Sequence, residues 1–164
     1  IPIIFLEPSC YSMFVEDYLE LGIKNAETIA KRCYLFEEFI DNLIKENRFS
    51  AKIKPLNQSV SIHIHCHIKS RFNSEFVKRV ATVATTAKVS IMDTACCGMA
   101  GAFGATESKY ELSRQVGMLM AKMIQSQPSD SVIVAHGTSC RQQIEHLTGK
   151  KALHTAQLLS KAIK

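Results

Sequence analysis

Short apolar runs alternate along the chain with stretches of helical periodicity, and this alternation predicts an α/β fold built from βα units. The apolar runs that favour strands lie at residues 2–6, 60–65, 89–93 and 131–136. Apolar positions spaced by three and four residues predict helices at residues 12–21, 25–46, 72–86, 108–125, 139–147 and 155–163. Because strands that are connected through helices pair in parallel, we expect a mainly parallel sheet with helices on both faces.

The length and composition favour one globular domain, residues 1–164, with an apolar core of its own. The chain has 164 residues, of which 46% are hydrophobic. Its first residue, Ile1, lies inside an apolar run, which we interpret as the start of a piece cut from a longer protein. No run is long enough to span a bilayer and the start lacks the pattern of a secretory signal, so we expect a cytoplasmic protein without a transmembrane segment.

The charges argue against a nucleic-acid-binding protein. The chain has 20 Lys and Arg against 15 Asp and Glu, a net charge of +5. These basic residues are scattered, and no basic stripe interleaved with aromatic residues is present, as a nucleic-acid groove would need. We therefore expect no nucleic-acid partner.

Five of the six cysteines share one position relative to the predicted strands. Each stands just past the carboxyl end of a strand and before a helix: Cys10, Cys66, Cys96, Cys97 and Cys140. Open α/β sheets bind their ligands at this edge, so we expect these cysteines to form a site there, as reduced thiols with a chemical role. Cys33 falls on the apolar stripe of the helix predicted at 25–46 and is expected to be a buried core residue.

A weak internal repeat relates Cys10 to Cys140. The segments "IIFLEPSC" and "VIVAHGTSC" each run from apolar residues to Ser-Cys and a helix. This predicts a site built twice, in which Cys10 belongs to a first half that lies mostly upstream. The second half would be complete in this chain, with Cys66, Cys96, Cys97 and Cys140.

The spacing of the thiols favours an iron-sulfur cluster over a single zinc ion. A structural zinc site often takes its ligands as Cys-x-x-Cys pairs, and no such pair is present. The adjacent residues Cys96 and Cys97 can each bind a different iron of one cluster. The following "CCGMAGAFG" places Gly98, Gly101 and Gly104 where the backbone can approach a bulky group and donate N–H groups to sulfur. Its spacing does not match a dinucleotide-binding fingerprint.

The stretch "SVSIHIHCHIK" carries three of the histidines. On a strand, Cys66 would point to one face with its isoleucine neighbours, and His63, His65 and His67 to the other. We expect His65 and His67 to be hydrogen-bonded residues around the site, with direct metal binding as the open alternative. His136, just before "GTSC", has the same two interpretations.

The words "EPSC", "HIHCHIK", "CCGMAGAFG", "YELS" and "GTSCRQQI" resemble, in order, the carboxyl-terminal cysteine-rich (CCG) region of FAD-linked D-2-hydroxy-acid dehydrogenases that also carry ferredoxin-type domains. The region is similar to the cysteine-rich subunit of heterodisulfide reductase, the small subunit of anaerobic glycerol-3-phosphate dehydrogenase and lactate-utilisation proteins. The resemblance implies cluster ligands at Cys66, Cys96, Cys97 and Cys140, with Cys10 as a further candidate. Gly137 departs from the final Cys-x-x-Cys of heterodisulfide reductase, which argues against a five-cysteine, non-cubane cluster of its kind.

The resemblance also implies a function. We expect an electron-transfer module with a cluster of the 4Fe-4S type, which is not catalytic alone. In the parent enzyme, a flavin domain holding FAD outside this chain would oxidise a D-2-hydroxy acid such as lactate, glycolate or 2-hydroxyglutarate. Ferredoxin-type domains and an electron acceptor would be partners, with the parent enzyme peripheral to the membrane as one option.

Two rival functions remain open at this point. The thiols could hold zinc, or no metal, and organise a surface that docks the flavin and ferredoxin domains. Alternatively, Cys96, Cys97 or Cys140 could carry out thiol-disulfide chemistry, although no Cys-x-x-Cys motif supports this.

Overall fold

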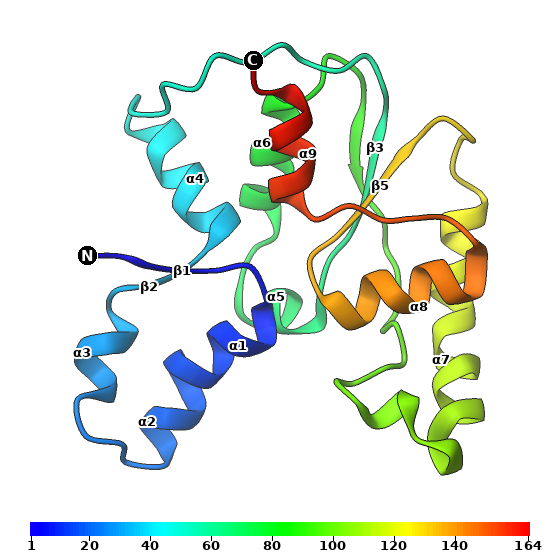
Figure 1. The fold of residues 1–164 in the computed structure, drawn as a ribbon, viewed down its shortest axis with the longest axis horizontal. Helices are drawn as coiled ribbons and strands as arrows, with labels where there is room; N and C mark the ends of the chain where they lie inside the picture. The colour runs from blue at the N-terminus through cyan, green and yellow to red at the C-terminus, as the bar shows by residue number, and fades with distance from the viewer.

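The computed structural model describes residues 1–164 and has three parallel strands at its centre (Figure 1). Strand β3 (Val60–His63) lies between β4 (Val89–Ile91) and β5 (Val132–Ala135) and pairs with both in parallel. The predicted α/β class is confirmed, and so are the strands expected at 60–65, 89–93 and 131–136.

Four helices cover the two faces of this main sheet: α6 (Glu75–Val83), α7 (Glu107–Gln125), α8 (Thr138–Thr148) and α9 (Thr155–Ala162). Successive residues of β5 point to opposite faces. Val134 joins the apolar cluster that contains α6 and α9, whereas Ile133 and Ala135 join the cluster that contains α7 and α8. Figure 1 shows α6 and α9 on one side of β3 and β5, with α7 on the other. None of the helices combines the length and apolar character needed to cross a membrane.

The first 45 residues form what we call the first unit, around a separate two-stranded sheet in which β1 (Ile3–Phe5) pairs with β2 (Cys33–Leu35) in parallel. The rest of the chain, which contains the main sheet, is the second unit. The helical segments of the first unit are α1 (Pro8–Ser12), the π-helical η1 (Met13–Asp17), α2 (Tyr18–Glu20), α3 (Ala26–Ala30) and α4 (Phe36–Lys45). The expectation that β1 shares the main sheet is therefore wrong. Cys10 does not reach the thiol edge through strand pairing.

The long helix expected at 25–46 is also wrong, because β2 divides it into α3 and α4. Its apolar residues satisfy a helical rhythm, but Cys33 and Leu35 are buried while Tyr34 between them is half-buried, which is the period of a strand. The backbone of β1 also needs a partner, and Ile3 N–H donates to Arg32 O over 2.8 Å. Cys33 is buried as expected, but on a strand.

Two contacts at the end of β1 join the first unit to the second. Glu7 Oε2 accepts a hydrogen bond from Thr138 N–H, at the start of α8, over 2.8 Å. His154 Nδ1 accepts a hydrogen bond from Ala156 N–H, so its Nε2 carries the proton and donates to Leu6 O over 3.0 Å. The first unit is therefore held against the helix that carries Cys140.

A buried acid lies among histidines in the same interface. Glu37 of α4 is 1% exposed, and its Oε1 lies 3.7 Å from His136 Nε2 and 3.6 Å from His154 Nε2. Glu37 Oε1 and His136 Nδ1 have no hydrogen-bond partner. Burial raises the pKa of the Glu37 carboxyl and lowers the pKa of His136 to about 3, so the interior disfavours the charged form of both groups.

We predict that acidification from pH 7 to pH 5 reduces the free energy of unfolding. The pKa of His136 is depressed in the folded state, so below the ordinary value of about 6.5 the unfolded chain binds the proton and the folded chain does not. This costs about 2 kcal/mol by pH 5. Urea unfolding followed by circular dichroism at several pH values measures the loss.

The contribution of His136 is isolated by comparing variants. The raised pKa of Glu37 acts with the opposite sign, since ionising a buried carboxyl costs stability as pH rises above its ordinary value. His136→Asn should lose about 2 kcal/mol of the pH dependence, whereas His146→Asn, on the exposed side of α8, should keep it. Equal pH dependence in both variants would contradict the assignment.

Candidate functional site

Four cysteines of the second unit line one cavity of about 230 Å³ at the carboxyl edge of the main sheet. The full lining, from the last residue of β3 and the segments that follow β3, β4 and β5, is His63, Ile64, Cys66, Lys69, Thr94, Ala95, Cys96, Cys97 and Cys140. We call it the thiol cavity. The sequence predicted this convergence from topology alone, since parallel strands bring their carboxyl ends to one edge.

Different local structures present the four thiols. Cys66 is the first residue of α5 (Cys66–Arg71), a helix that the sequence did not predict, and Cys140 is the third residue of α8. Cys96 and Cys97 lie in the irregular segment after β4. Cys66 and Cys96 are exposed, whereas Cys97 and Cys140 are 5% and 2% exposed. The cavity therefore has an open side and a buried side.

The thiols influence one another electrostatically. Hydrogen bonds lower the pKa of Cys97 to about 6, with the Cys140 thiol as the largest contributor and the Met99 N–H as another, against the opposing effect of burial. The same contact with Cys97, together with burial, raises the pKa of Cys140. Burial and the neighbouring Cys96 raise the pKa of Cys66. One thiolate is stabilised by its neighbours, but further negative charge needs a cation in the cavity.

The glycine-rich segment after the cysteines depends on a left-handed backbone. Gly98 has φ +87° and donates its N–H to Cys96 Sγ over 3.3 Å, as expected of this segment. A Cβ at Gly98 would lie 2.1 Å from Ser113 O, so the bulky neighbour that excludes a side chain is helix α7. Gly101 has φ +69° with open space around it, while a Cβ at Gly104 would meet Ser113 Oγ at 2.1 Å.

The alternation expected for the histidines stops early. β3 ends at His63 and the chain turns into α5, so His63 lines the thiol cavity with Cys66 instead of pointing away from it. His65 is the N-cap of α5, and its Nδ1 accepts a hydrogen bond from His67 N–H over 3.2 Å. A Cβ at Gly137 would lie 2.4 Å from His65 Cδ2 and 3.2 Å from Cys140 Sγ, so this glycine allows the imidazole to pack beside the cysteine.

The other two histidines have hydrogen-bond partners outside the cavity. His67 Nδ1 lies 2.7 Å from Ser12 Oγ, which is on α1 of the first unit. His136 is fully buried, with Nε2 3.2 Å from Thr155 Oγ1. Neither lines the thiol cavity. Both histidines are hydrogen-bonded, and their role around a metal site stays a prediction.

Cys10 and Cys140 occupy the same position in the two repeat segments but not the same environment. Each is the third residue of its helix, α1 or α8. Cys10 is exposed and does not line the thiol cavity. Its assignment to a separate first-half site stays a prediction.

The sequence did not single out Lys69 or Thr94, and it assigned His63 to the wrong face. Lys69 Nζ donates a hydrogen bond to Thr94 O, and His63 Nδ1 lies 2.6 Å from Thr94 Oγ1. The spacing of Lys69 three residues after Cys66 could have placed both on one face of a helix, had α5 been predicted.

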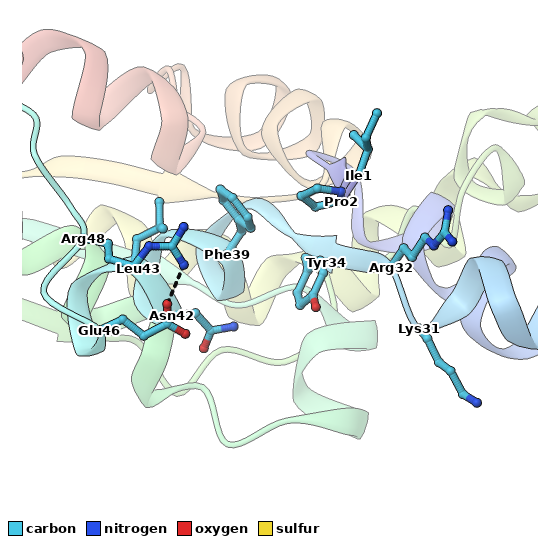
Figure 2. A pocket seen from close by; sticks show the side chains of 10 residues that line it. All are labelled: Ile1, Pro2, Lys31, Arg32, Tyr34, Phe39, Asn42, Leu43, Glu46 and Arg48. Carbon is cyan, nitrogen blue, oxygen red and sulfur yellow. Dashed lines mark hydrogen bonds and ion pairs between the residues drawn. The ribbon is translucent and has the colours of Figure 1, made fainter.

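A second cavity, of about 280 Å³, lies between the start of the chain and α4 (Figure 2). Its lining is Ile1, Pro2, Lys31, Arg32, Tyr34, Phe39, Asn42, Leu43, Glu46 and Arg48. Arg48 is paired with Glu46 over 2.8 Å, as Figure 2 shows. The cavity contains no cysteine or histidine, and we assign it no part in the site.

Nowhere in the chain do three His, Cys, Asp or Glu side chains form a group suited to a single metal ion.

The family of cysteine-rich domains called CCG matches residues 60–145, from the start of β3 into α8. The matched range contains all four cysteines of the thiol cavity. The chain belongs to this family, which confirms the family expected from the sequence motifs.

Two curated relatives share one description, as a subunit of anaerobic glycerol-3-phosphate dehydrogenase, and come from Escherichia coli K12 and Escherichia coli O157:H7. Each is 23% identical over 163 residues, which cover 99% of this chain but 41% of the relative. The chain thus spans less than half the length of these relatives. No solved structure matches it.

We predict that Gly98→Ala destabilises the chain by about 3 kcal/mol or more, because the added Cβ would collide with Ser113 O and the left-handed backbone would be strained. Gly101→Ala is the matched control, since it has a similar φ without a steric neighbour and should cost about 1 kcal/mol. Thermal and urea unfolding measure both. Equal losses would show that the close approach to α7 does not matter.

Proposed function

We propose that this chain is the iron-sulfur electron-transfer module of a larger dehydrogenase. Cys66, Cys96, Cys97 and Cys140 would hold a cluster of the 4Fe-4S type in the thiol cavity. The observation that carries the proposal is the convergence of these four thiols, from three strand ends, on a single cavity. When bound, such a cluster stores and passes on single electrons.

The properties of the cavity support a cationic, sulfur-binding group. Thiolates are the usual ligands of iron-sulfur clusters, and the hydrogen bonds that lower the pKa of Cys97 favour its thiolate form. The Gly98 N–H donates to Cys96 Sγ, which is how a protein spreads the negative charge on a coordinating sulfur. The side chains of His65 and His67 hold the start of α5, and through it Cys66, in place.

The parent enzyme is proposed from the comparisons and from the sequence motifs together. The curated relatives are subunits of an anaerobic glycerol-3-phosphate dehydrogenase, which supports a dehydrogenase as the parent. A flavin domain with FAD, ferredoxin-type domains and an electron acceptor would be the partners. A D-2-hydroxy acid as substrate rests on the sequence motifs alone.

Experiment distinguishes two alternative functions. A zinc-binding or metal-free docking module would use the same thiols, and iron and sulfide analysis separates it from an electron-transfer module. Thiol-disulfide chemistry is favoured by the contact between the Cys97 thiolate and Cys140, but both residues are buried, which restricts access by a second protein or peptide.

We predict that cluster assembly depends on Cys97 and Cys140 but not on Cys10 or Cys33. The experiment is anaerobic reconstitution of the chain with iron and sulfide, read by bound iron, bound sulfide and absorbance in the visible range. Cys97→Ser and Cys140→Ala should lose most of the iron, because each removes a cavity thiol. Cys10→Ala and Cys33→Ala should keep it.

The comparison of Cys10→Ala with Cys140→Ala is the most informative one, since both cysteines have equivalent positions in their helices. Circular dichroism establishes that each variant folds before iron is measured. Equal loss from Cys10→Ala and Cys140→Ala would favour one cluster shared by both units. Full iron and sulfide in Cys140→Ala would remove that residue from the ligand set, and zinc uptake without visible absorbance would favour the docking module.

A further inference from the structure

Lys69 is the one lysine or arginine that lines the thiol cavity. It follows Cys66 by three residues on α5, so both side chains lie on one face of the helix. Its ammonium group is a fixed positive charge beside sulfur ligands that become negative when they bind metal. No other fixed charge lines this cavity.

The ammonium is held in place by the backbone that leads to the cysteine pair. Lys69 Nζ donates a hydrogen bond to Thr94 O, two residues before Cys96. Thr94 is 3% exposed, and its Oγ1 lies 2.6 Å from His63 Nδ1 at the end of β3. The segment from Thr94 to Cys96 is thus anchored from α5 and from β3.

The positive charge of Lys69 affects the pKa of His63, which lines the same cavity. Burial lowers the pKa of His63 to about 3, and the positive charge of Lys69 is the second cause. His63 therefore remains neutral at physiological pH, which leaves Lys69 as the positive group. Lys69 is nevertheless exposed on its outer side, so solvent screening limits the size of its effect.

We infer that Lys69 is a positioning residue that also raises the reduction potential of the cluster proposed for this cavity. The inference rests on the proposed function. Reduction adds one electron, taken from a one-electron donor, to the cluster, and no bond forms or breaks. The added negative charge is stabilised by the nearby ammonium, which favours the reduced state. The hydrogen bond to Thr94 O keeps Cys96 and Cys97 directed at the cavity.

The test compares three variants of the reconstituted chain. Lys69→Met removes the charge and keeps an apolar stem, Lys69→Arg keeps the charge, and Lys161→Met removes an equal charge from the exposed side of α9. Dithionite serves as the electron donor in an anaerobic redox titration followed by visible absorbance and electron paramagnetic resonance. Iron and sulfide are measured first in every sample.

In Lys69→Met, we expect the equilibrium constant for reduction to fall about tenfold, a shift of about 59 mV to lower potential for one electron. Lys69→Arg should stay within about threefold of the parent chain, and Lys161→Met should not change. The difference between Lys69→Met and the parent should shrink at about 0.5 M salt, because exposed charges are screened. A purely structural role would not produce this salt dependence.

An unchanged potential in Lys69→Met with full cluster content would overturn the charge effect. Absence of a cluster from the parent chain would instead refute the proposed function, and the positioning role is then tested without metal. Amide hydrogen exchange at Thr94 to Cys97 should be about tenfold faster in metal-free Lys69→Met than in Lys161→Met. Equal exchange in the two variants would overturn the positioning role.

Discussion

The register of β3 with its two neighbours is the constraint on which the site depends. Val60 pairs with Val89 of β4 and with Val132 of β5, so the three strands start level and end at nearly the same height. Because all three run in parallel, the chain leaves each strand at the same edge and must turn there. The thiol cavity is formed by these turns, and a shift of one strand by one residue would also turn its buried side chains to the opposite face.

Topology made much of this architecture predictable. Short β-branched runs separated by helical periods are a strong signal for βα units, and the strands at β3, β4 and β5 were found for that reason. The segment from Cys33 to Leu35 was misread because a strand of three residues fits inside a helical stripe. Its partner β1 lies nearly thirty residues away in the chain, and local periodicity does not contain that pairing.

The sequence predicted the cysteines of the site but not the residues that surround them. Strand order explains why four cysteines meet in one cavity, namely Cys66, Cys96, Cys97 and Cys140. The sequence also predicted that these cysteines are reduced thiols. The roles of Lys69, Thr94 and His63 were not predicted, because they depend on where β3 stops and α5 begins. Strand ends are the least certain part of a pattern, and because β3 stops at His63, the alternation that assigned faces to His63 and Cys66 does not extend to Cys66.

The four thiols of the cavity differ in their exposure to solvent, so reagents in solution reach them unequally. Cys66 and Cys96 face solvent, while Cys97 and Cys140 are enclosed by α7 and α8. Dissolved oxidants and alkylating reagents therefore meet one pair of sulfurs before the other in the metal-free protein. In the proposed electron-transfer role, a donor or acceptor that works at contact range would approach from the same side. The enclosed pair has its surroundings defined by the protein, whereas the outer pair is partly surrounded by solvent.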